Sequence, residues 1–156
     1  MANNYNKINN NLFYFREYNF KENEIEYNLR IEIIDKNIIF TLSNLDDNLE
    51  CAYKNKIELL TIINKFELNP SKYSDPETLL KIFDNIYQKN QISINIIEDN
   101  SFNISIKLLN ILGEEITAEI ELIKEFMNDK DKFKYLFSII KLMKKKIMKK
   151  KQKIKK

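Results

Sequence analysis

The sequence predicts an α+β fold, with two antiparallel β-meanders on either side of an inserted helical hairpin and a long basic helix at the C-terminus. Three observations predict it. Apolar and polar residues alternate over 25–42 and again over 92–122, as they do in half-buried antiparallel strands. Over 55–87 the apolar residues instead recur at helical spacing. After Glu125 the spacing is helical again and the chain becomes rich in lysine.

The first meander opens with an aromatic strand over 13–20, which is followed by a hairpin over 25–42. A short further strand is expected over 49–53. The strand over 25–33 has one apolar and one polar face, so we expect the polar face to be solvated. That polar face carries Glu26, Asn28, Arg30 and Glu32.

The helical hairpin is predicted from two apolar stripes. The first helix covers 55–68 and ends before Pro70, because a residue that precedes proline avoids helical backbone. The second helix has Asp75 or Ser74 as its N-cap and Pro76 at the favoured first position. Its apolar stripe consists of Leu79, Leu80, Phe83, Ile86 and Tyr87.

The second meander supplies three more strands, over 92–96, 102–108 and 116–122. Gly113, the only glycine in the chain, stands where the last hairpin turn requires a positive φ. Each of these strands is expected to turn its apolar row to the core and its polar row to solvent.

The chain is therefore expected to contain a flexible N-terminus (1–11), a single α+β domain (12–125) and an amphipathic to Lys-rich C-terminal helix or tail (126–156). Apolar residues in the last segment follow a heptad pattern, which leaves two interpretations open. The segment forms a short coiled coil, or its first part docks on the sheet while the rest projects into solvent. The heptad residues are Phe133, Leu136, Ile140, Met143, Ile147 and Ile154.

Charge is strongly segregated along the chain. Lysine and arginine number 26 and aspartate and glutamate 23, a net charge of +3. Residues 141–156 hold ten lysines and no acid, which leaves 16 basic and 23 acidic residues, a net charge of −7, in 1–140. Such segregation favours an acidic or polyanionic partner for the basic segment. We predict that this lysine tail binds an acidic protein surface through Lys141, Lys144, Lys145, Lys146, Lys149, Lys150, Lys151, Lys153, Lys155 and Lys156.

Nucleic acid is the alternative partner. Aromatic residues interleave with arginine over 13–20, and surfaces of this kind stack on unpaired bases. A nucleic-acid-binding subunit would combine the lysine tail with a face formed by Tyr14, Arg16 and Tyr18. Peripheral contact with an anionic membrane is a less favoured partner, since the tail has no Trp or Phe to anchor it.

The residue types that the chain lacks disfavour an enzyme. No histidine is present to act as the base of a catalytic triad, and one glycine is too few for a phosphate-binding loop. The carboxylate pairs Glu114/Glu115 and Glu119/Glu121 are interpreted as solvated surface. The stretch 128–132 is interpreted as a helix cap, because it lacks the glycine and final glutamate of a calcium loop. We expect no catalytic residues, no cofactor and no metal site.

The location expected from the sequence is intracellular. Cys51 is the only cysteine and is interpreted as a small core residue, so nothing calls for an oxidising compartment. The polar N-terminus has no apolar stretch of the secretory type. We expect the cytoplasm, with the nucleus as the alternative. The sequence thus predicts a non-catalytic scaffold or complex subunit that acts through protein–protein interaction.

Overall fold

Within the described residues, eight strands form one antiparallel sheet. The computed structural model describes residues 5–8, 11–45, 51–98, 101–130, 133, 140, 143–145 and 147–149. Its strands lie in the order β1-β2-β3-β4-β5-β8-β7-β6. They are β1 (Tyr5–Ile8), β2 (Asn11–Glu22), β3 (Ile25–Ile34), β4 (Asn37–Asn44), β5 (Cys51–Glu58), β6 (Ile92–Glu98), β7 (Ser101–Leu109) and β8 (Glu115–Phe126).

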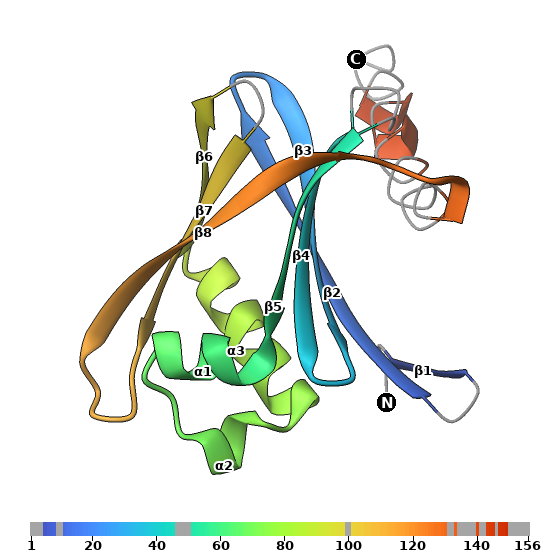
Figure 1. Cartoon of the computed structure of the whole chain (residues 1–156). Coiled ribbons are helices and arrows are strands. Elements are labelled where there is room, and N and C mark those ends of the chain that lie inside the picture. The colour runs from blue at the N-terminus through green and yellow to red at the C-terminus, as the bar shows by residue number, and fades with distance from the viewer. Residues whose placement is uncertain are drawn as a thin grey trace.

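The two meanders join where β5 pairs with β8. In this joint Cys51 lies opposite Phe126, and Lys54 lies opposite Ile123. The sheet then curls strongly into a barrel-like form, with three short helices on its concave side (Figure 1). These are α1 (Leu59–Lys65), α2 (Pro70–Tyr73) and α3 (Pro76–Gln88).

Local signals define the ends of α3. The Asp75 carboxylate accepts a hydrogen bond from the Thr78 backbone N–H at 3.1 Å, which confirms the N-cap predicted at this position. At the other end Asn90 adopts a φ of 58° and the Gln91 N–H donates to the Ile86 carbonyl at 2.8 Å. A left-handed residue of this kind is a common way to end a helix.

The core lies on the concave side of the sheet. Phe83 of α3 packs edge-on against Phe40 of β4, with ring centroids 6.2 Å apart. Elsewhere in the interior, Phe102 of β7 contacts Tyr27 of β3 and Tyr53 of β5, at 5.5 and 4.5 Å between centroids. Strands that lie far apart in the sheet therefore meet through aromatic side chains across its interior.

The prediction of an α+β fold with a long basic C-terminal helix was wrong. The chain is mainly antiparallel β, and its longest continuous helix among the described residues, α3, has 13 residues. After Phe126 the described residues include short helical stretches but no long helix. Most of the segment over 131–156, where the long helix was expected, lies outside the described residues.

The helix expected over 55–68 was also misplaced at its start. Residues up to Glu58 belong to β5, where Asn55 pairs with Phe40, and α1 begins only at Leu59. At the N-terminus, β1 pairs with the start of β2 in a stretch that the sequence predicts to be flexible. Among the described residues, no helix combines the length and apolar character needed to cross a bilayer.

Another correction concerns the polar face of β3. Asn28, Arg30 and Glu32 were expected in solvent, yet they are 1%, 5% and 3% exposed. Their cross-strand neighbours on β4, Thr41 and Ser43, are buried as well. The polar residues on the convex face of β3 and β4 are therefore buried. The apolar–polar alternation of the sequence does not predict this burial.

Candidate functional site

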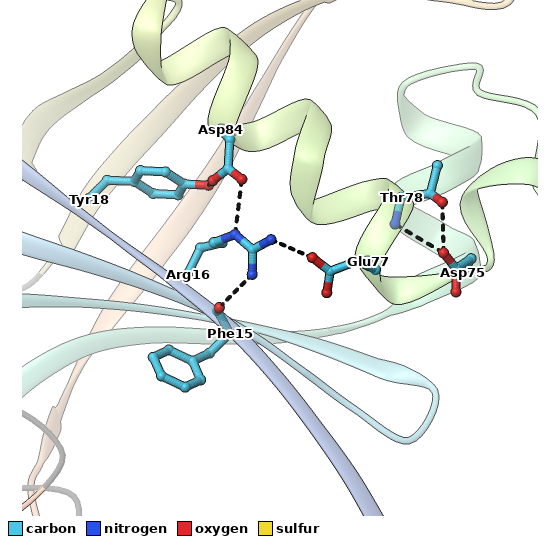
Figure 2. A network of polar contacts seen from close by, with 7 residues as sticks. All are labelled: Phe15, Arg16, Tyr18, Asp75, Glu77, Thr78 and Asp84. Atoms are coloured by element: carbon cyan, nitrogen blue, oxygen red, sulfur yellow. Dashed lines mark hydrogen bonds and ion pairs between the residues drawn. The ribbon is translucent and has the colours of Figure 1, made fainter. Parts of the chain in front are cut away.

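A network of charged and hydroxyl groups fixes α3 on β2 (Figure 2). The Arg16 guanidinium donates from Nε to Asp84 Oδ2 at 2.9 Å and from Nη2 to Glu77 Oε1 at 2.6 Å. Tyr18 Oη donates to the other Asp84 oxygen, Oδ1, at 2.7 Å. Because Glu77 and Asp84 lie on one face of α3, two side chains of β2 hold two turns of the helix.

The electrostatics of this network keep Arg16 and Tyr18 in the protonated forms that donate its hydrogen bonds. Burial lowers the pKa of Arg16, but its hydrogen bonds to Glu77 and Asp84 outweigh that effect, so the net shift is upward. Burial and the hydrogen bond to Asp84 raise the pKa of Tyr18 far above its ordinary value. Arg16 thus stays charged, Tyr18 stays protonated, and both Asp84 oxygens accept a hydrogen bond.

The residues predicted as an aromatic binding face turn inward. Tyr18 is 5% exposed, and Tyr14 packs beside the buried core. Arg16 is engaged by α3 as described above. All three side chains lie on the concave side of β2, where Arg16 and Tyr18 contact α3 and Tyr14 packs against the core. Phe15 lies on the opposite, convex side of β2, where its ring contacts Arg30.

The convex side of β2 and β3 carries its own buried ion cluster. Arg30 lies between two carboxylates: its Nη1 contacts Glu17, and its Nε lies 3.2 Å from Glu32 Oε1. The Phe15 ring stacks on the same guanidinium, with the Arg30 Cζ 4.1 Å from the ring centroid. This cluster is the buried polar face that sequence reasoning expected in solvent.

The lysine tail is described only in part. Lys144, Lys145 and Lys149 are exposed and have helical backbone, and the ion pairs found among the described residues do not involve them. Met143 and Ile147, two of the predicted heptad residues, are also exposed, at 58% and 52%. The other seven predicted tail lysines lie outside the described residues: Lys141, Lys146, Lys150, Lys151, Lys153, Lys155 and Lys156.

A cavity of about 280 Å³ lies between α3 and the adjoining ends of β7 and β8. Its apolar wall includes Ile82, Ile86 and Leu108. Its polar wall includes two lysines, two amides, a phenol and a carboxylate. These are Lys89, Lys107, Asn85, Gln91, Tyr73 and Glu115.

This cavity was missed by sequence reasoning. Its lining comes from α2, α3 and two strands, and no motif or spacing joins those segments. Contacts between them close its sides: the Lys107 N–H donates to the Gln91 carbonyl at 3.0 Å, and Lys107 Nζ lies 3.0 Å from Glu115 Oε1. The arrangement suits a small ligand with an apolar body and a polar head.

The remaining candidates have ordinary surroundings. Glu119 is exposed on β8 and accepts a hydrogen bond from Asn103 Nδ2 at 3.2 Å. Cys51 is half-buried on β5. In the stretch 128–132, the first three residues are exposed and the last two are not described. Within the described part of the chain, no three metal-ligating side chains of the His, Cys, Asp or Glu types are gathered.

Comparison with known proteins assigns no family. No protein-family model matches the chain, and no curated protein matches its sequence.

Proposed function

We propose that the protein is a non-catalytic interaction module, a scaffold or complex subunit, that attaches through its lysine tail to an acidic surface of a partner protein. One observation carries the proposal. Ten lysines and no acid lie in residues 141–156, whereas residues 1–140 carry a net charge of −7. A cationic segment on an acidic body attracts a partner of opposite charge to one defined place.

The ion pairs of the body support this division. Its two arginines and two of its lysines pair with the body's own carboxylates: Arg16 with Asp84, Arg30 with Glu32, Lys21 with Glu24, and Lys107 with Glu115. The described tail lysines are exposed, and they take part in none of these four pairs. Their side chains are therefore accessible to another molecule.

An acidic protein surface fits better than nucleic acid for two reasons. The side chains of Tyr14, Arg16 and Tyr18 are engaged inside the molecule, so they offer no platform on which bases could stack. The net charge of the body is negative, so it repels a long polyanion that extends past the tail. A compact acidic patch on a protein meets only the tail and avoids this repulsion.

An intracellular location belongs to the same proposal, since the lone half-buried Cys51 requires no oxidising compartment. The absence of catalysis is supported by the closed network around Arg16, in which Asp84 already accepts two hydrogen bonds.

The test compares three full-length proteins in their binding to a labelled oligo-glutamate peptide by fluorescence anisotropy. They are the wild type, a variant with all ten tail lysines changed to glutamine, and a control with the same lysines changed to arginine. We expect the glutamine variant to lose at least about tenfold in affinity, because its tail has no charge. The arginine control should bind like the wild type.

Two results would overturn the proposal. One is a glutamine variant that binds the peptide as tightly as the wild type. The other is wild-type binding to a single-stranded oligonucleotide, or to vesicles of anionic lipid, that is clearly tighter than binding to a peptide of the same charge. Either of these would assign the tail to a different class of partner.

A further inference from the structure

We infer that the cavity between α3 and the adjoining ends of β7 and β8 binds a small monocarboxylate with a short apolar chain. The inference does not depend on the lysine tail, because the lining residues of the cavity all lie between Tyr73 and Glu115.

Size and wall chemistry define the body of the ligand. A cavity of about 280 Å³ lies near the lower limit for small-molecule sites, so it suits a ligand smaller than a nucleotide. Behind the buried Ile86 and Leu108, the lining also includes the half-buried Ile82 and Leu109, which is 62% exposed, so the wall offers apolar surface to a ligand. Covering such a wall with a short alkyl chain removes apolar surface from water and favours binding.

The charges around the cavity define the head of the ligand. Lys107 is paired with Glu115 at 3.0 Å, whereas Lys89 takes part in none of the ion pairs found among the described residues. The lining therefore holds two cations and one anion, and the excess positive charge belongs to Lys89. The amides of Asn85 and Gln91 are additional hydrogen-bond donors in the same wall.

One negative charge fits this site better than two. Lys89 is the C-cap of α3, so the negative end of the helix dipole lies beside it. Glu115 adds a second negative group to the wall. Both of these negative groups oppose an anion, and they oppose a phosphate dianion more strongly than a carboxylate, whose single charge Lys89 can balance. The ligand class is therefore a monocarboxylate.

The experiment titrates the full-length protein with hexanoate and follows backbone amide shifts by two-dimensional NMR. We expect shifts that saturate and that are confined to the walls of the cavity, in 82–91 and 107–115. Hexanamide has the same chain without the charge, and it should bind at least about fivefold more weakly because it cannot pair with Lys89.

Lys89 at the C-cap of α3 and Lys81 within the helix give a matched pair of variants. Lys89→Gln should weaken hexanoate binding about tenfold, which is the effect of losing one charge-assisted hydrogen bond. Lys81→Gln removes an exposed lysine of the same helix outside the cavity lining, and it should leave the affinity unchanged. Both positions are exposed, so both variants are expected to fold.

Three outcomes would overturn the inference. Hexanoate could leave the cavity amides unshifted, hexanamide could bind as tightly as hexanoate, or Lys89→Gln could bind hexanoate as tightly as Lys81→Gln. None of them bears on the lysine tail, so failure here is distinct from failure of the proposed function.

Discussion

Tyr18 of β2 donates its phenolic hydrogen to Asp84 of α3 over 2.7 Å, which joins two residues that lie 66 positions apart in the chain. The same carboxylate accepts from Arg16 at 2.9 Å. A second link lies nearby, where Tyr87 of α3 donates to the Asn19 carbonyl of β2 at 2.6 Å. The helix is thus held against the sheet by polar contacts as well as by its apolar face.

Removing the Tyr18 hydroxyl should destabilise the fold. Tyr18→Phe leaves one oxygen of Asp84 without its partner in a half-buried position, at an expected cost of about 1–2 kcal/mol in the free energy of unfolding. The measurement is urea denaturation followed by circular dichroism. Tyr73→Phe is the control, since no hydrogen bond of the Tyr73 hydroxyl is found among the described residues. It should change stability by less than about 0.5 kcal/mol.

Stability should also fall at alkaline pH because of Tyr18. Its pKa is raised in the folded state, while in the unfolded chain it keeps the ordinary value of about 10. Below that value both states are protonated and the full stability is present. Above it, ionisation of Tyr18 lowers the free energy of the unfolded state but not that of the folded state. The free energy of unfolding therefore decreases.

The contribution of Tyr18 is isolated by comparison with Tyr18→Phe. Wild-type stability should drop more steeply than that of the variant above about pH 10, although Tyr27, whose pKa burial also raises, contributes to both proteins. Equal slopes for the two proteins would show that Tyr18 ionises in the folded state as easily as in the unfolded one.

Thr41→Val should stabilise the protein. The Thr41 hydroxyl is buried on the convex face of β4 and has no hydrogen-bond partner among the described residues. Valine has nearly the same shape and removes the unpaired polar group, so we expect a gain of about 1 kcal/mol. Thr117→Val, the same change at an exposed position of β8, is the control and should have little effect. A loss of stability in Thr41→Val would mean that the hydroxyl is hydrogen-bonded in solution.

Gly113→Ala should destabilise the β7–β8 hairpin. Gly113 adopts a φ of 77°, and a Cβ built there would meet no atom within 4 Å, so the cost comes from the backbone alone. We expect a loss of about 1 kcal/mol in thermal or urea denaturation. Gly113→Asn should cost less, since asparagine tolerates this conformation better than alanine. Equal stability of alanine and glycine at this position would contradict the assigned turn.

Local features of this molecule were predictable from its sequence. Alternation located β3, β4 and the second meander, the Asp75–Pro76 pair located the start of α3, and the positive φ of Gly113 was expected from its place before a strand. Each of these depends on residues that are close in sequence. Short-range physics therefore accounts for most of the individual elements.

Long-range relationships were not predictable. The pairing of Cys51–Lys54 with Ile123–Phe126 merges the two meanders into one sheet, and only four residues on each strand carry it. The strand over 13–20 is aromatic on both faces, so periodicity could not decide which face meets the core. Arg16 turns inward because α3 offers it two carboxylates. The cavity beside Lys89 likewise exists only after α3 has docked.

The most direct test of the central claim is the affinity of the full-length chain for an oligo-glutamate peptide as salt is increased. Attachment through the lysine tail predicts that affinity falls steeply between about 50 mM and about 200 mM salt, because exposed charges are progressively screened. It also predicts that the variant with ten glutamines in place of the tail lysines shows little affinity at any salt concentration. An affinity that stays constant across the salt series, or that the glutamine variant retains, would contradict the account.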